Sequence, residues 1–190
     1  MMHLWSKLRL DSSIIPILCS NLIDFIYSAK LVIFSKTSCG RLHMSKNHRK
    51  LKCLFVCAGN ACRSQLAEGW CRFFWKDRLE AYSAGVAPHG FVDLRIIKVM
   101  TEAGVDISAQ WSKHLKEYDG VQFDYVITLC GNAQLVCPAF PEGTKVLHME
   151  FAAPPQLAAA SRNEEEALVH YRNVRDAIKT FIENIPRLVS

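Results

Sequence analysis

Short, almost wholly apolar runs alternate along this chain with longer segments whose apolar residues recur every three or four positions. Runs of the first kind are typical of strands buried on both faces of a parallel sheet, and segments of the second kind are typical of amphipathic helices. The pattern predicts strands over residues 52–57, 80–85, 123–130 and 145–149. It predicts helices over residues 63–77, 92–103 and 163–183.

Strands that alternate with helices imply an α/β fold, a doubly wound four-stranded parallel sheet flanked by helices, with ligands at the carboxyl ends of the strands. The apolar positions of each predicted helix should face the core. These positions are Leu66, Ala67, Trp70, Phe73 and Phe74 in the first helix, Leu94, Ile97 and either Met100 or Val99 in the second, and Leu168, Tyr171, Val174, Ile178 and Phe181 in the third.

The first 43 residues do not follow this alternation. Residues 14–34 are apolar, but polar and charged residues such as Asp24 and Lys30 interrupt them, which disfavours a membrane span. No small-x-small cleavage site follows a clean apolar run, which disfavours a signal peptide. We expect residues 1–43 to be an extension that is spurious, disordered or helical, with a membrane-associating helix and a signal peptide as alternatives. The domain is then predicted over residues 44–190.

Composition and charge exclude several classes of protein. The chain has 190 residues, of which 50% are hydrophobic and 22% are charged, so it can bury a core and is not disordered or fibrous. Its net charge is +5, but residues 1–43 hold five Lys/Arg against two Asp/Glu, which leaves +2 for residues 44–190. Because there is also no long basic run or zinc-finger motif, we expect no nucleic-acid partner.

The segment between the first strand and the first helix has the composition of an anion-binding loop. It runs Cys57-Ala58-Gly59-Asn60-Ala61-Cys62-Arg63-Ser64. A loop this short can turn its backbone N–H groups inward around a tetrahedral oxyanion, and the helix N-terminus adds its positive dipole end. Gly59 and Asn60 tolerate the left-handed backbone that such curling requires. Arg63 can donate to two oxygens of the anion.

Cys57 is the candidate nucleophile of this loop. The surrounding donors should stabilise its thiolate near neutral pH, and Ser64 could donate a further hydrogen bond to it. The alternative is that Cys57 is a small buried residue that closes a strand, as many lone cysteines are. The combination of a preceding strand, a following helix and the sequence Gly-Asn-x-Cys-Arg-Ser favours the oxyanion site.

The loop VCAGNACRSQLAEGW resembles the active-site loop of the low-molecular-weight tyrosine phosphatase superfamily, in the form found in thioredoxin-coupled arsenate reductases. The resemblance continues in order and spacing and covers essentially residues 51–184. Its further segments are YSAGVAPHG (82–90), GVDIS (104–108), VITLCGNAQLVCP (126–138) and VRDAI (174–178).

The resemblance implies that the chain reduces arsenate to arsenite with three cysteines. Cys57 attacks arsenate, Cys130 attacks the Cys57 sulfur and releases arsenite, and Cys137 then attacks Cys130. Thioredoxin reduces the resulting disulfide and serves as the electron donor, so no bound cofactor or metal is expected. Sulfate and phosphate would compete with arsenate. The family also implies a monomeric, cytoplasmic protein.

Other interpretations of the eight cysteines remain open. Cys130 and Cys137 could both be structural, and a zinc site could use them together with Cys57 and Cys62. The spacing disfavours zinc because it lacks the tight Cys-x-x-Cys knuckle of structural sites. We expect the remaining cysteines to be structural, or, in residues 1–43, to have no functional role; they are Cys53, Cys71, Cys19 and Cys39.

The sequence departs from the family at two places. Ala153 precedes Pro154 where the family carries the Asp that serves as general acid, so water or a nearby carboxylate such as Glu150 would have to substitute. This loss most disfavours the alternative function of a protein tyrosine phosphatase, which needs a proton for its leaving group. The loss of this Asp also leaves open a third function, that of a catalytically weak protein that binds oxyanions or senses redox state.

The second departure concerns a potassium ion that some members hold near the loop asparagine. Asn60 and Ser83 match that site, but Trp111 and Lys113 stand where those members have Thr and Asp. A lysine ammonium would replace the ion, so we predict no potassium requirement.

Overall fold

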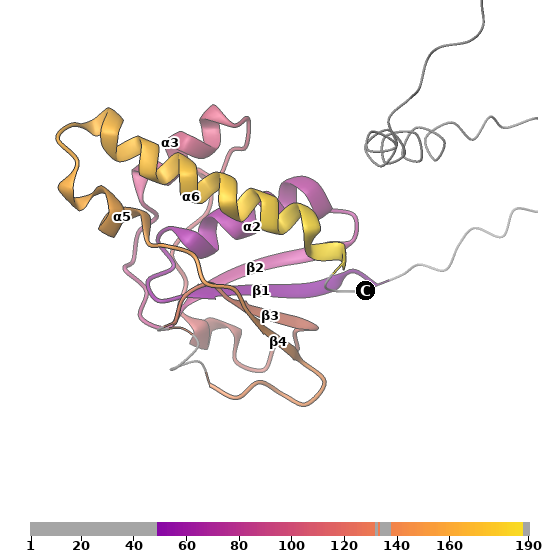
Figure 1. The fold of residues 1–190 in the computed structure, drawn as a ribbon. Helices are drawn as coiled ribbons and strands as arrows, with labels where there is room; N and C mark the ends of the chain where they lie inside the picture. The colour runs from indigo at the N-terminus through magenta and orange to yellow at the C-terminus, as the bar shows by residue number, and fades with distance from the viewer. Residues whose placement is uncertain (1–48, 132, 134–137, 188–190) are drawn as a thin grey trace, which may run out of the picture. The chain divides into compact units, whose positions relative to one another are not determined.

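A four-stranded, wholly parallel sheet forms the centre of the domain, in the order β2-β1-β3-β4 (Figure 1). The computed structural model describes residues 49–131, 133 and 138–187. The predicted extension over residues 1–43 and the predicted relay residue Cys137 lie outside these described residues. The strands are β1 (Leu51–Cys57), β2 (Leu79–Gly85), β3 (Tyr125–Thr128) and β4 (Lys145–His148). The predicted fold class is therefore confirmed.

The order of the strands places the loops after β1 and β3 side by side. Within the sheet, β2 lies next to β1 at one edge, and β3 lies next to β1 on the side away from β2. The direction in which successive strands are added therefore reverses between β1 and β3. Such a reversal opens a crevice at the carboxyl ends of the strands, where ligands bind in open α/β sheets. Cys57, the last residue of β1, lies at this point.

The three long helices pack together on one side of the sheet (Figure 1). They are α2 (Arg63–Trp75), α3 (Leu94–Glu102) and α6 (Glu164–Asn184), and both α2 and α3 contact α6. The short α5 (Pro154–Leu157) precedes α6. Three 3₁₀ turns complete the described structure, over Leu115–Tyr118, Ala158–Ala160 and Ile185–Arg187.

The opposite side of the sheet is covered by the segment that contains the first 3₁₀ turn. Tyr82 of β2 packs edge-on against Tyr118 and Phe123, with ring centroids 5.7 Å and 5.5 Å apart. These aromatic pairs bury one face of the sheet while α2 and α6 bury the other. Because both faces are covered, β1 consists of buried residues from Cys53 to Cys57, as its apolar sequence predicted.

The helical faces were predicted well but not completely. Ile96, Val99 and Met100 of α3 are buried, whereas Leu94 is 79% exposed, so its predicted inward position is wrong. Leu94 is the first residue after the N-cap Asp93, and the buried stripe begins only two residues later. Phe73 of α2 is also exposed and contacts Trp70 by its ring edge.

The third strand is shorter than predicted. A strand was expected over residues 123–130, but β3 covers only Tyr125–Thr128. At its start, the Asp124 carboxylate accepts hydrogen bonds from Lys52 N and from both terminal nitrogens of Arg49, which lowers the pKa of Asp124. At its end, Leu129 N still donates to Val56 O, and the chain then turns at Cys130.

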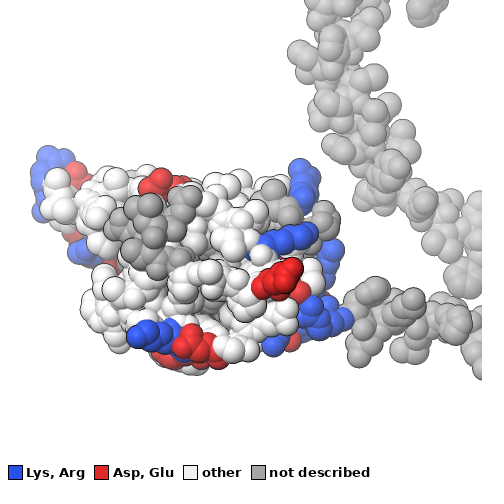
Figure 2. All heavy atoms as spheres, turned by 90° about the horizontal axis from the view of Figure 1, so that it is seen from below, with Lys and Arg blue, Asp and Glu red and all other residues white. Residues whose placement is uncertain are grey.

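Charged side chains are scattered over the face of the domain shown in Figure 2. Small acidic and basic groups alternate there with uncharged surface, as the small net charge of residues 44–190 suggests. Among the helices of the described residues, none is both long enough and apolar enough to cross a membrane.

Candidate active site

The left-handed backbone predicted for the loop that follows β1 is present at Asn60 but not at Gly59. Asn60 has a φ of 44°, which makes it the one described non-glycine residue in the left-handed region. Asparagine tolerates this region better than most residues. The neighbouring Gly59 is needed for a different reason: a Cβ there would lie 2.5 Å from Nε2 of His89, whose ring packs on the loop.

The segment from Gly85 to Asp93 engages the carbonyl groups of the loop. Backbone N–H groups of this segment donate to the carbonyls of Cys57, Ala58, Gly59 and Ala61. A Cβ on Gly85 would lie 2.8 Å from Ala58 O, so glycine permits this close approach. Because the carbonyls are occupied here, they do not face an anion in the loop.

The Cys57 thiol lies among hydrogen-bond donors and is only 2% exposed. Asn60 N donates to the Cys57 sulfur at 3.2 Å, and the Ser64 hydroxyl lies 3.0 Å from it. Asn60 Nδ2 donates to Ser64 Oγ at 2.8 Å, which leaves the hydroxyl hydrogen of Ser64 available for the sulfur. The Cys57 sulfur therefore lies within reach of two hydrogen-bond donors of its own loop.

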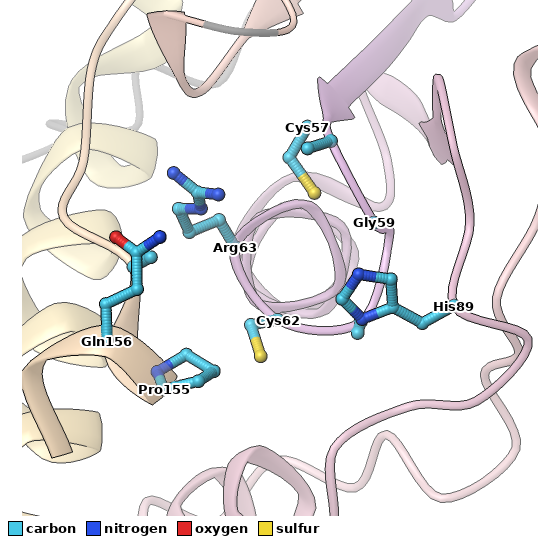
Figure 3. A pocket seen from close by; sticks show the side chains of 10 residues that line it. Cys57, Gly59, Cys62, Arg63, His89, Pro155 and Gln156 are labelled. Atoms are coloured by element: carbon cyan, nitrogen blue, oxygen red, sulfur yellow. The ribbon is translucent and has the colours of Figure 1, made fainter. Parts of the chain in front are cut away.

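Arg63 is oriented by the loop that follows β4. Its Nη1 donates to Phe151 O at 3.1 Å, and its guanidinium lies between Cys57 and Gln156 (Figure 3). A cavity of about 260 Å³ opens in front of these groups. It is lined by Cys57, Ala58, Gly59, Ala61, Cys62, Arg63, His89, Ala153, Pro155 and Gln156. None of these described lining residues carries a carboxylate, as the sequence indicated at Ala153.

Cys130 follows β3 and lies at a second cavity. It is 4% exposed and lines this cavity, of about 300 Å³, together with Arg63, Gly131, Glu150, Ala153 and Gln156. Arg63, Ala153 and Gln156 line both cavities, so the cavity at Cys57 and the cavity at Cys130 adjoin. The predicted neighbourhood of Cys57 and Cys130 at the ends of adjacent strands is thus present.

A buried polar network is hydrogen-bonded to the loop that follows β1. Glu68 of α2 is 1% exposed and accepts hydrogen bonds from Ser83 Oγ and Lys113 Nζ, the latter at 3.2 Å. Ser83 Oγ also accepts from Asn60 Nδ2, so the network reaches the loop. Lys113 Nζ further donates to Trp111 O and lies 4.6 Å from the centre of the Trp111 ring.

Cys62 is directed away from the Cys57 thiol. Its sulfur donates to Asp93 Oδ2 at 3.7 Å, and the same oxygen accepts a hydrogen bond from the Tyr171 hydroxyl at 2.6 Å. Burial, followed by the negative charge of Asp93, raises the pKa of the Cys62 thiol well above its usual range. Cys62 is therefore a protonated structural thiol.

The remaining described cysteines are buried in the core, as predicted. Burial raises the pKa of Cys71 to about 12 and also raises the pKa of Cys53 well above its usual range. All five described cysteines are free thiols. Within the described part of the chain, no three His, Cys, Asp or Glu side chains are grouped as a metal site would require.

Sequence reasoning missed three residues of the site. Glu68 was given no role, although it lies four positions after Ser64 and therefore on the same helix face. His89 and Gln156 line the first cavity; His89 lies in the quoted segment YSAGVAPHG but was given no role there, and no motif identified Gln156. Only the fold brings residues so distant in sequence to the same cavity.

Known proteins share this fold and loop. Residues 52–185 match the family described as low molecular weight phosphotyrosine protein phosphatase. An arsenate reductase of Halalkalibacterium halodurans is 43% identical over 133 residues, which are 68% of this chain and 93% of that protein.

Solved structures give the same result. An arsenate reductase in the phosphate binding state aligns with a TM-score of 0.59 and 28% identity, over 74% of this chain and 99% of the other. A thioredoxin-dependent arsenate reductase of Corynebacterium glutamicum aligns with a TM-score of 0.56 and 26% identity, over 74% of this chain and 62% of the other. This chain belongs to the low molecular weight phosphotyrosine protein phosphatase family.

Proposed function

We propose that this protein reduces arsenate to arsenite through Cys57, Cys130 and Cys137, with thioredoxin as the final reductant. The observation that carries the proposal is that Cys57 and Cys130 follow two adjacent strands and line two cavities that share Arg63. The names of the similar proteins, among them arsenate reductases at about 43% identity, support the same activity.

The first step would form a bond between Cys57 and arsenic. The Cys57 thiolate attacks arsenate, and one hydroxyl group of arsenate takes a proton from solvent and departs as water. Arg63 and the backbone N–H groups of residues 58–64 hold the remaining oxygens of the adduct. The loop donors and Ser64 favour the thiolate that this attack requires.

The second step would reduce arsenic. Cys130 attacks the Cys57 sulfur, and the sulfur–arsenic bond breaks with its electron pair remaining on arsenic. Arsenic changes from the pentavalent to the trivalent state, and the two thiols are oxidised to the Cys57–Cys130 disulfide. Cys137, which lies outside the described residues, would then attack Cys130 and release Cys57. Thioredoxin reduces the Cys130–Cys137 disulfide and restores the enzyme.

A coupled assay tests the proposal. Arsenite production is measured with thioredoxin, thioredoxin reductase and NADPH for the wild type, Cys130→Ser and Cys137→Ser. We expect turnover only in the wild type, while Cys39→Ser, outside the matched region, serves as the control with full turnover. Full turnover of either relay variant would refute the relay.

The same preparations distinguish the alternatives. Hydrolysis of an aryl phosphate without arsenite production would indicate a phosphatase, which needs Cys57 and Arg63 but no second cysteine. Binding of arsenate or sulfate without either reaction would indicate an oxyanion-binding or redox-sensing protein.

A further inference from the structure

The cavity beside Cys130 contains a carboxylate that the proposed reaction does not yet use. Of the described residues that line this cavity, Glu150 is the one acidic residue. It does not line the cavity of Cys57. Its position therefore relates it to the step carried out by Cys130 and not to the first attack on arsenate.

The backbone holds Glu150 firmly against the strand that leads to Cys130. Met149 N donates to Thr128 O at 2.9 Å, and Phe151 N donates to Leu129 O at 3.2 Å. These two bonds flank Glu150 on both sides. They continue the pairing of β3 with β4 beyond the ends of both strands, so residue 150 keeps a fixed place opposite the turn at Cys130.

The side chain of Glu150 extends toward that turn. A Cβ added to Gly131 would lie 3.5 Å from Oε1 of Glu150, which places the carboxylate over the residue that follows Cys130. The cavity of about 300 Å³ between them has room for water. A carboxylate can thus exchange a proton with the thiol directly or through one water molecule.

The chemistry of Cys130 requires a proton acceptor. A thiolate, and not a thiol, attacks another sulfur, and Cys130 is almost completely buried from bulk solvent. Glutamate is ordinarily ionised at neutral pH and can accept a proton.

We propose that Glu150 accepts the thiol proton of Cys130 while Cys130 attacks the Cys57 sulfur. The S–H bond of Cys130 breaks, and its proton passes to the carboxylate. The new bond joins the two sulfurs, and the electron pair of the sulfur–arsenic bond remains with arsenic. The carboxyl then returns the proton to solvent or to the departing arsenite. The inference rests on the proposed function, because it takes arsenate as the substrate. Its test includes an arm that does not require arsenate.

The test measures one disulfide in a single turnover. In a Cys137→Ser background, the Cys57–Cys130 disulfide accumulates and is quantified by alkylation and peptide mass spectrometry. One arm uses arsenate. The other arm uses hydrogen peroxide, which oxidises Cys57 to a sulfenic acid and is itself reduced to water. Attack by Cys130 on the Cys57 sulfur then forms the disulfide and releases a second water molecule. Both arms require the same deprotonation of Cys130.

Four proteins are compared in each arm: the parent, Glu150→Gln, Glu150→Asp and the control Glu142→Gln. Glu142 is an exposed glutamate that precedes β4, whereas Glu150 follows β4, and Glu142 does not line the cavity of Cys130. At pH 6.5 we expect Glu150→Gln to form the disulfide about 10- to 100-fold more slowly, the lower part of the range for proton-transfer catalysis. Glu150→Asp should recover part of the rate, and Glu142→Gln should match the parent.

The pH dependence separates proton transfer from a structural role. The deficit of Glu150→Gln should shrink as the pH rises toward 9, since hydroxide can then remove the thiol proton in place of the carboxylate. Equal alkylation of Cys57 by iodoacetamide in both proteins would show that the loop is intact. A deficit that is the same at every pH, or no deficit at all, would overturn the role of Glu150.

The two arms also separate this inference from the proposed function. If the parent forms the disulfide with peroxide but not with arsenate, arsenate reduction is refuted and the peroxide arm still decides the role of Glu150. If arsenate works and Glu150→Gln has no deficit in either arm, only the role of Glu150 is refuted. If the parent fails in both arms, both ideas are refuted.

Discussion

The ammonium group of Lys113 lies 3.2 Å from the carboxylate of Glu68 in the interior of the domain, and two hydrogen bonds, through Ser83 to Asn60, join Glu68 to the loop that carries Cys57. Both side chains are at least 96% buried, so each charge depends on the other for its stabilisation. Arg72, which is half exposed, makes a second ion pair with Glu68.

Replacement of Lys113 by Met should therefore destabilise the protein. It leaves Glu68 with a single, partly exposed cationic partner, and breaking a buried ion pair in this way costs about 3–5 kcal/mol. The free energy of unfolding in urea measures the loss. Lys116→Met, at an exposed position three residues later, is the matched control and should change stability by less than about 0.5 kcal/mol. Equal stability of the two variants would contradict this prediction.

Potassium should have no effect on turnover. The Lys113 ammonium is covalently part of the chain and already neutralises Glu68, so no free cation is required there. Initial rates of arsenite formation in sodium chloride and in potassium chloride, at equal ionic strength, should agree. A rate that increases with potassium would show that the lysine does not take the place of the ion.

Ser64→Ala should make Cys57 less reactive. The hydroxyl of Ser64 lies 3.0 Å from the sulfur, and a hydrogen bond to a charged group contributes about 1.5–3 kcal/mol. We expect alkylation of Cys57 by iodoacetamide at pH 7 to slow by about tenfold. Ser112→Ala removes a hydroxyl that donates to Gly59 O in the same loop but does not contact the sulfur, and it should alkylate at the normal rate.

Cys62 should resist alkylation at a pH at which Cys57 reacts. The raised pKa of Cys62 keeps its thiol protonated through pH 8, and Asp93 accepts its hydrogen bond. After brief treatment with iodoacetamide at pH 8, peptide mass spectrometry should find label on Cys57 and not on Cys62. Asp93→Asn removes the negative charge and should increase labelling of Cys62. Equal labelling of both cysteines in the wild type would refute the assignment.

Ala153→Asp should increase aryl phosphatase activity. Ala153 lines both cavities of the site, so an aspartate there can protonate a leaving group. General acid catalysis contributes about 10²–10⁴-fold, and we expect a gain near the lower limit, measured as hydrolysis of p-nitrophenyl phosphate. Ala152→Asp adds the same charge at an exposed residue that does not line either cavity and should have little effect. A similar gain in both variants would indicate a general effect of charge.

The sequence predicted the features of the fold that depend on local pattern. Each strand was found because its apolar run is bounded by turn residues, and the position of Cys57 followed from its place at the end of such a run. The ends of β3 could not be predicted, because they depend on Asp124 and on the turn at Cys130. The apolar sequence FDYVITLC continues beyond the residues that pair.

Other features depend on contacts between segments that are far apart in the sequence. Glu68 looks like any charged helix residue until Lys113 and Ser83, 45 and 15 positions further along the chain, are placed against it. The packing of His89 on Gly59 and the proximity of Glu150 to Gly131 have no local signal either. The prediction of Leu94 as a core residue was wrong because periodicity alone does not fix which turn of a helix first reaches the core.

The hydrogen bond from Arg63 to Phe151 O has a consequence for the strength of anion binding. A free arginine side chain samples many rotamers, and a ligand that orders it must overcome the lost conformational entropy. In this protein one of the five N–H donors of the guanidinium is engaged before any anion arrives, which leaves the other donors already oriented. The binding site is preorganised, so less of the interaction energy with a tetrahedral oxyanion is lost to ordering the arginine.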